Sequence, residues 1–149
     1  MPHNKKNQEI REQIILARFK NHFPEFPKGI ITKSESPDFI VKTGKKHTIG
    51  IELTSILKHR HETDVGGNHL ETPELVPEII EKTIQIKENK LVRYRQKKLD
   101  EIWLIIEVQN IMNNTSFNIS NKLNNWNFIS EFNKIYLFES VNKKVFELK

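Results

Sequence analysis

The chain has 149 residues and a net charge of +5, the size of one domain with a single core, so we expect residues 1–149 to form one domain. It has no cysteine, which excludes disulfides, thiolate nucleophiles and cysteine-based zinc fingers. No apolar run is long enough to cross a membrane, and residues 1–6 lack the apolar core of a signal peptide. We therefore expect a cytoplasmic protein whose positive charge favours polyanions such as nucleic acid.

The first third of the chain predicts one helix and three strands. A helix is expected over about residues 7–23, ended by the prolines that follow it. Its apolar surface is formed by Leu16, Phe19 and Phe23 on one side, extended by Ile10, Ile14 and Ala17. A short strand at residues 30–32 precedes a hairpin, with strands at 38–42 and 47–53 around a turn that contains glycine.

The middle of the chain predicts a loop, a long helix and a buried strand. Residues 58–72 are polar, have no periodicity and include two adjacent glycines, which is typical of a loop. A helix is expected over about residues 78–98, entered through a proline. Residues 102–108 are almost continuously apolar, which indicates a central strand covered on both faces.

The last third predicts a helix at residues 121–132, carrying Trp126 and Ile129, and two short strands at 134–138 and 144–148. The predicted element order is therefore αβββαβαββ. Because a helix connects the hairpin to the central strand, we expect an α/β fold with a mixed sheet flanked by helices.

The hairpin brings two acidic residues together. Asp38 stands at the start of one strand, and Glu52 lies in the middle of the next, between isoleucine and leucine. A carboxylate buried among apolar side chains is costly unless it is compensated. Two carboxylates and the carbonyl of Leu53 at one end of a sheet would suit Mg²⁺, which prefers oxygen ligands and retains water.

The segments Pro37-Asp38-Phe39-Ile40 and Gly50-Ile51-Glu52-Leu53-Thr54 resemble the PD-(D/E)XK nuclease superfamily, and the element order over about residues 8–110 is similar to its core. The resemblance implies a restriction-endonuclease-like fold and a Mg²⁺ or Mn²⁺ ion bound by Asp38 and Glu52. It also implies a catalytic lysine two residues after the glutamate. Thr54 occupies that position here, so the local motif lacks its lysine.

The long helix offers a replacement for this lysine, as it does in some members of the superfamily. At about 100° per residue, one apolar stripe runs along it. The stripe consists of Ile80, Ile84, Leu91 and Tyr94. Lys87 lies in the middle of the stripe, where a charge requires an anionic partner, so it is the first candidate. Lys90, at the edge of the stripe, is the second.

The superfamily also commonly draws an acidic residue from its first helix. Glu12 lies on the same side of the predicted helix as Leu16 and Phe19, so it is expected to reach the sheet, with Glu9 as an alternative. The alternative for either residue is a glutamate on the solvated side of the helix, with no functional role.

Basic residues suggest where nucleic acid would bind. The loop that follows Glu52 contains Lys58, Arg60 and His61, which we expect to contact phosphates. The histidines of this loop, His59 and His69 included, offer a weaker alternative as a zinc site. The long helix ends in a basic run, which would bind phosphates or favour the helix C-terminus. That run comprises Arg93, Arg95, Lys97 and Lys98.

The sequence therefore predicts a Mg²⁺- or Mn²⁺-dependent endonuclease that hydrolyses phosphodiester bonds, with DNA as the expected substrate. Asp38, Glu52 and Glu12 would hold the metal, and Lys87 or Lys90 would position water or offset charge. A domain of this size encloses little of a duplex, so a homodimer or a partner protein is expected. The main alternative is a catalytically inactive module that binds nucleic acid or protein, and a third is an immunity- or antitoxin-like protein.

Overall fold

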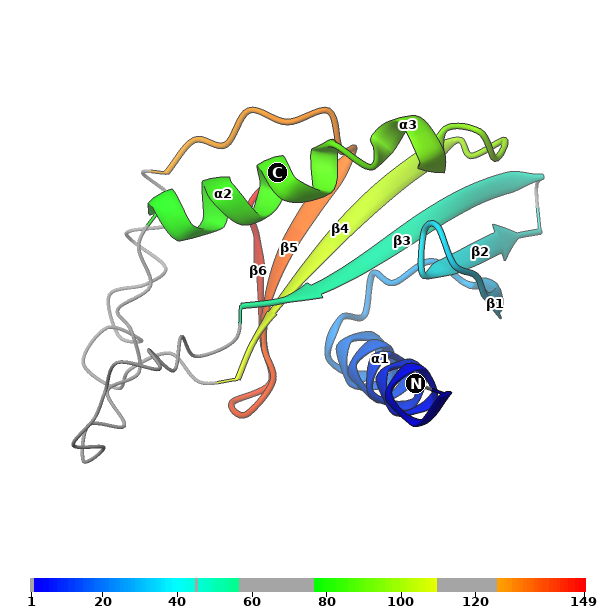
Figure 1. The fold of residues 1–149 in the computed structure, drawn as a ribbon, viewed down its shortest axis with the longest axis horizontal. Coiled ribbons are helices and arrows are strands. Elements are labelled where there is room, and N and C mark those ends of the chain that lie inside the picture. Colours follow the sequence, from blue (N-terminus) through cyan, green and yellow to red (C-terminus); the bar gives the residue numbers. More distant parts are fainter. Residues whose placement is uncertain (1, 45, 57–76, 110–125) are drawn as a thin grey trace.

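The computed structural model describes residues 2–44, 46–56, 77–109 and 126–149. Its centre is a six-stranded mixed sheet in which the strands follow chain order (Figure 1). The strands are β1 (Gly29–Lys33), β2 (Phe39–Thr43), β3 (His47–Ser55), β4 (Glu101–Val108), β5 (Lys134–Glu139) and β6 (Lys144–Glu147). β3, β4 and β5 are parallel, and the outer pairings are antiparallel. All six predicted strands and the mixed α/β class are confirmed.

Helices cover both faces of the sheet (Figure 1). α1 (Pro2–His22) packs on one face, where Ile15, Leu16 and Phe19 enter a core with the aromatic side chains of β4 and β5. α2 (Pro77–Glu88) and α3 (Leu91–Tyr94) pack on the other face. No helix in the described part of the chain is long and apolar enough to span a membrane.

The predicted apolar surface of α1 is partly wrong. Leu16 and Phe19 are buried, but Ile10 and Ile14 are 46% and 47% exposed, and Ala17 is exposed as well. Ile15 takes their place in the core, because the helix contacts the sheet along one narrow stripe. The turns before Ile15 therefore leave the apolar core and carry polar side chains past the edge of the sheet.

The predicted long helix at residues 78–98 is divided. α2 ends at Glu88, a turn spans Asn89 and Lys90, and α3 begins at Leu91. Asparagine is a weak helix former because its side chain competes for backbone hydrogen bonds, which explains a break at this position. The predicted apolar stripe nevertheless holds across the break, because its four apolar members are all buried: Ile80, Ile84, Leu91 and Tyr94.

The predicted helix at residues 121–132 is wrong for the part that the structure describes. Residues 126–132 form no helix, and residues 121–125 lie outside the described part of the chain. Phe128 and Phe132 are buried, whereas Ile129 is 92% exposed and Trp126 only partly buried. The many asparagines of this segment disfavour a helix. The backbone N–H of Ile102 also donates to the side chain of Asn133, which fixes an irregular entry into β5.

β3 extends beyond its neighbour β2, and this difference in length creates the candidate site. The pairing of β2 with β3 ends where Phe39 faces Ile51, whereas β3 continues to Ser55 and stays paired with β4. Residues 52–55 of β3 therefore have one edge that no described strand covers. We call this segment the open edge of β3.

Candidate active site

Asp38 and Glu52 lie together at the start of the open edge. The backbone N–H of Asp38 donates to Oε1 of Glu52 at 3.3 Å, and the backbone N–H of Leu53 donates to Oδ2 of Asp38 at 2.9 Å. These reciprocal bonds hold one carboxylate against the other. Because the N–H and C=O of a strand residue point to the same side, the carbonyl of Leu53 also faces this edge. The structure therefore gathers the two carboxylates and one carbonyl.

A glycine in β3 lets the loop before β2 lie this close. A Cβ atom on Gly50 would lie 2.7 Å from Cγ of Pro37 and 2.8 Å from Cδ1 of Leu99, closer than side chains tolerate. The loop is closed by the backbone N–H of Ser34, which donates to the carbonyl of Asp38 at 2.7 Å. Gly50 and the Pro37 ring thus position Asp38 over β3.

Glu52 is the hub of the site. It is only 4% exposed, and its Oε2 accepts hydrogen bonds from Nζ of Lys87 at 3.0 Å and from the hydroxyl of Tyr94 at 2.5 Å. The structure thus places the first lysine candidate of the sequence analysis, Lys87, against a carboxylate of the pair. The second candidate, Lys90, is exposed and makes no side-chain bond within the described residues.

Without a metal ion, the repulsion between the carboxylates of Asp38 and Glu52 is only partly compensated. Burial, the charge of Glu52 and a hydrogen bond to Glu52 raise the pKa of Asp38 to about 7, and the charge of Glu12 adds to this. The hydrogen bond from the Leu53 N–H opposes the shift only in part. Burial and the bond to Glu52 likewise raise the pKa of Tyr94 above its ordinary value. A divalent cation between the carboxylates would relieve their repulsion, so this donor set fits Mg²⁺ or Mn²⁺.

Glu12 is linked to the pair through Lys33, a residue that sequence reasoning missed. Nζ of Lys33 lies 2.6 Å from Oε2 of Glu12, 3.9 Å from Oδ1 of Asp38 and 3.3 Å from its carbonyl oxygen. The ammonium also lies 4.7 Å from the ring centroid of Phe39. The signal that could have identified Lys33 is the register of β1 and β2, which sets it opposite Phe39, the residue after Asp38. Within the described residues, no group of three or more acidic or histidine side chains is placed to hold a metal ion.

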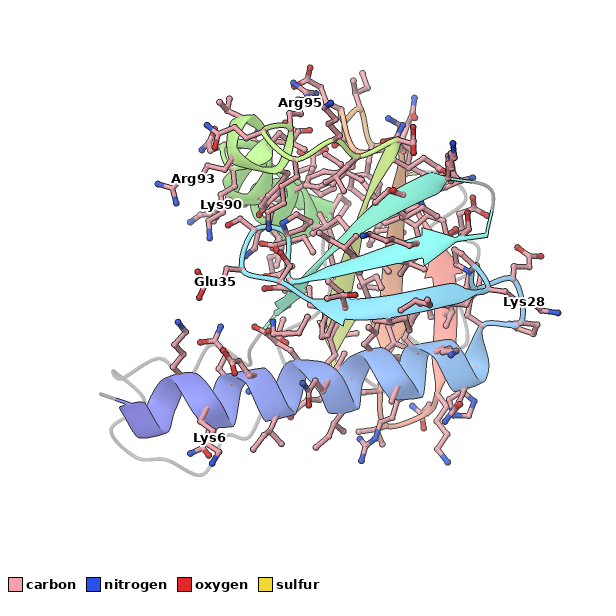
Figure 2. All side chains as sticks on the ribbon, turned by 90° about the vertical axis from the view of Figure 1, so that its right-hand side faces the viewer. Lys6, Lys28, Glu35, Lys90, Arg93 and Arg95 are labelled. Atoms are coloured by element: carbon pink, nitrogen blue, oxygen red, sulfur yellow. The ribbon has the colours of Figure 1, made fainter. Side chains whose placement is uncertain are left out.

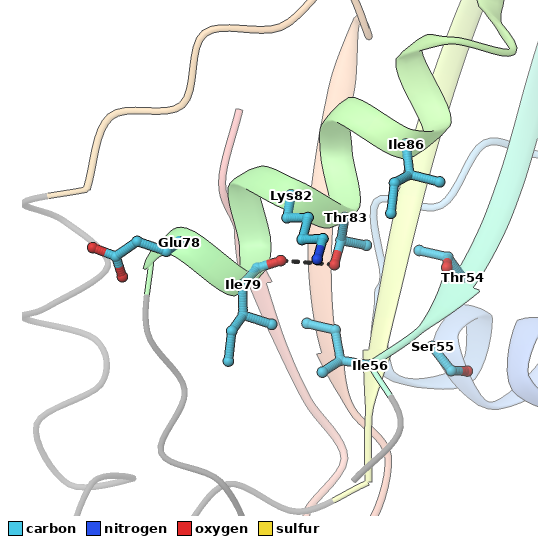
Figure 3. A pocket seen from close by; sticks show the side chains of 8 residues that line it. All are labelled: Thr54, Ser55, Ile56, Glu78, Ile79, Lys82, Thr83 and Ile86. Carbon is cyan, nitrogen blue, oxygen red and sulfur yellow. Dashed lines mark hydrogen bonds between the residues drawn. The ribbon is translucent and has the colours of Figure 1, made fainter. Parts of the chain in front are cut away.

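A pocket of about 480 Å³ opens beside the pair, between α1 and the open edge. Its walls include Arg11, Glu12, Leu53, Thr54, Ser55 and Lys87. Thr54, at the position of the motif lysine, also borders a second pocket of about 480 Å³ against Ile79 and Ile86 of α2 (Figure 3). Lys87 therefore reaches the carboxylate of Glu52 from α2, while Thr54 of β3 lines both pockets.

The predicted basic contacts divide into three groups. Lys90 and Arg93 project into solvent on one side of the molecule, above Glu35 (Figure 2). Arg95 pairs with Glu131 at 3.4 Å, and Lys97 donates to the hydroxyl of Ser34. The loop contacts and the zinc alternative fall outside the described residues: Lys58, Arg60 and His61, with His59 and His69.

Comparisons with models of protein families, with curated proteins and with solved structures found no match for this chain.

Proposed function

We propose that the protein is a metal-dependent nuclease that hydrolyses phosphodiester bonds, with DNA as its substrate. One observation carries the proposal: two carboxylates, Asp38 and Glu52, share a confined site at an open strand edge, and the ammonium of Lys87 contacts one of them. Asp38, Glu52 and the carbonyl of Leu53 would hold Mg²⁺ or Mn²⁺. Such an ion, when bound, supplies a Lewis acid for the phosphoryl group and a more acidic water.

The chain's own residues account for the remaining parts of a hydrolysis. Water loses a proton as its oxygen bonds to phosphorus, the bond to the leaving nucleoside oxygen breaks, and that oxygen takes up a proton. Lys87 stands where its ammonium would orient the water or offset the negative charge that develops on the phosphoryl oxygens. Tyr94 and Lys87 both donate to Oε2 of Glu52, which fixes that carboxylate in one orientation. The lysine role thus belongs to α2 in this proposal.

Exposed cations near Lys87 favour a polyanionic substrate. Lys90 and Arg93 follow Lys87 at successive three-residue steps, and both project into solvent (Figure 2). In the described part of the chain neither is joined to a carboxylate, unlike Arg95. Cations that are free of acidic partners are the ones that bind phosphates by releasing counterions. DNA phosphates would therefore be held by residues that follow Lys87 in the chain, at Lys90 and in α3.

The main alternative is an inactive module of the same fold that binds nucleic acid or protein. Two observations favour it. Thr54 stands in place of the motif lysine, and the ammonium groups of Lys33 and Lys87 already contact the carboxylates of Glu12 and Glu52. Because these ammonium groups already offset the repulsion between the carboxylates, the cluster is less destabilised when no metal is bound.

Nicking of supercoiled plasmid DNA in Mn²⁺, together with calorimetry of Mn²⁺ binding, separates the two functions. We expect nicking by the unaltered protein, a loss of at least about 100-fold in Asp38→Ala and Lys87→Ala, and no loss in Asp100→Ala, an exposed aspartate outside the site. Metal binding without nicking supports the inactive module. Neither binding nor nicking overturns both the enzyme and the metal site.

A further inference from the structure

Another buried carboxylate, Glu107, contacts Arg11 and Ser55, two residues that line the same pocket, and has no part in the metal pair. Its side chain is 7% exposed, its Oε1 accepts a hydrogen bond from the hydroxyl of Ser55 at 2.8 Å, and the guanidinium of Arg11 lies 3.5 Å away. We propose that Arg11, positioned by Glu107, binds the substrate phosphate next to the one that is attacked. This inference rests on the proposed function and adds a phosphate subsite to it.

The fold brings these three groups together at a fixed place. Ser55 and Glu107 face each other in the register of β3 and β4, and both lie on the face of the sheet that α1 covers. Arg11 reaches them from α1, one residue before Glu12. The subsite thus shares β3 with Glu52 and α1 with Glu12, and backbone pairing of β3 with β4 sets the position of Ser55 and Glu107 relative to Glu52.

Arg11 is anchored but not saturated. Its guanidinium carries five N–H donors, and its contact with Glu107 is a single ion pair at 3.5 Å, longer than a hydrogen bond. The side chain is 47% exposed, and within the described residues it has no other acidic partner. A buried carboxylate behind a half-exposed arginine fixes its direction while leaving most of its donors open to the pocket. Such a fork suits a phosphate.

The spacing along the open edge suits consecutive phosphates. Leu53, at the metal pair, and Ser55, at Arg11, are two residues apart, which is about 7 Å in a strand. This is comparable with the separation of neighbouring phosphates in an extended nucleic-acid strand. The cations on the pocket wall are Lys87 and Arg11, whereas its acidic group, Glu12, is paired with Lys33. A phosphodiester chain along this edge would place one phosphate at the pair and the next at Arg11.

Binding of a short single-stranded oligothymidylate in Ca²⁺, titrated at several salt concentrations, tests the subsite. Arg11→Ala should weaken binding about tenfold and lower the salt slope by about 0.7, one phosphate contact fewer. Arg18→Ala is the matched control, because this exposed arginine lies on the same helix about 10 Å further along. It should change neither quantity. The double variant Arg11→Ala, Glu107→Gln should bind no more weakly than Arg11→Ala alone, because Glu107 acts through Arg11.

A small substrate separates this inference from the proposed function. Bis(p-nitrophenyl) phosphate has a single phosphodiester and no neighbouring phosphate, so Arg11→Ala should raise KM for the oligonucleotide by a much larger factor than it changes Mn²⁺-dependent hydrolysis of this small substrate. If Arg11→Ala binds the oligonucleotide as the unaltered protein does, with the same salt slope, the subsite is refuted and the nuclease stands. If Asp38→Ala retains full activity on the small substrate, the nuclease assignment itself fails.

Discussion

Acidic side chains lie beside each end of β3, and their charges are compensated differently at the two ends. At the start of the strand, Oε2 of Glu101 lies 2.6 Å from Nε2 of His47, and Oε1 accepts a hydrogen bond from Trp103. Asp100 accepts one from the backbone of Thr48. Burial alone would raise the pKa of Glu101, but the bonds from His47 and Trp103 outweigh it and lower the pKa. Each carboxylate here has its own donors and lies near solvent.

At the other end of β3, Asp38 and Glu52 contact each other and are more deeply buried, and the pKa of Asp38 is raised to about 7. Folding by itself gains nothing from pressing two carboxylates together, whereas the Glu101 end stabilises the fold as it stands. A site that lowers stability in the free protein is what a bound cation would explain. The contrast therefore favours the Asp38 end as the place of the proposed function.

The largest expected difference between the two ends of β3 is in how much the free energy of unfolding falls when a glutamate is replaced. Glu52→Ala removes the partner of Lys87, whose side chain is only 16% exposed, and leaves a buried ammonium without an anion. We expect it to lower the free energy of unfolding by about 3 kcal/mol, measured by urea denaturation. Glu101→Ala is the matched control, and it should cost less than about 1 kcal/mol because the side chains of Glu101 and His47 are both partly exposed to water.

Equal losses in these two variants would show that Glu52 is an ordinary ion-pair residue. The distinction drawn between the ends of β3 would then have no energetic basis.

The next largest effect is a pair of pH dependences with opposite sign. The pKa of Asp38 is raised in the folded protein, so its contribution to stability is present below its unfolded pKa and is lost as the pH rises through about 7. Asp38→Asn should therefore be more stable than the unaltered protein by about 2 kcal/mol at pH 8, with the gain shrinking toward pH 4. Thermal unfolding across this range measures the difference.

Glu101→Gln should show the reverse. The pKa of Glu101 is lowered, so its contribution is present above its unfolded pKa and is lost as the pH falls toward the folded value. The glutamine variant should thus be less stable than the unaltered protein at neutral pH, with the deficit closing in acid. An Asp38→Asn variant that is destabilised at pH 8 would contradict the repulsion inferred for the pair.

The hairpin and the placement of its carboxylates were accessible from sequence because they depend on local rules. A glycine-containing turn and two β-branched segments set the register, and the register brings Asp38 to Glu52. Lys87 was accessible for a different reason. A lysine in the middle of an apolar stripe requires an anion, and the structure supplies Glu52.

Other parts of the site depend on contacts between distant segments. Lys33 contacts Glu12 only because α1 packs against the sheet, and Arg11 contacts Glu107 for the same reason. No local pattern encodes the course of α1. The helix predicted at residues 121–132 failed similarly. It was expected to carry Trp126 and Ile129, whereas the irregular chain buries Phe128 and Phe132 and leaves Ile129 exposed.

The smallest of the expected effects asks which donors stabilise the charge of Glu52. Tyr94→Phe removes one hydrogen bond to a buried carboxylate and should cost about 1.5 kcal/mol in urea. Tyr136→Phe is the control, because Tyr136 is also buried but makes no side-chain hydrogen bond among the described residues. It should change stability by less than about 0.5 kcal/mol. If both variants behave alike, Lys87 is the side chain that compensates Glu52, and moving that lysine toward a phosphate would leave the backbone N–H of Asp38 as the main donor to the carboxylate. If Tyr94→Phe is costly, the tyrosine holds Glu52 in place while Lys87 is free to act on substrate.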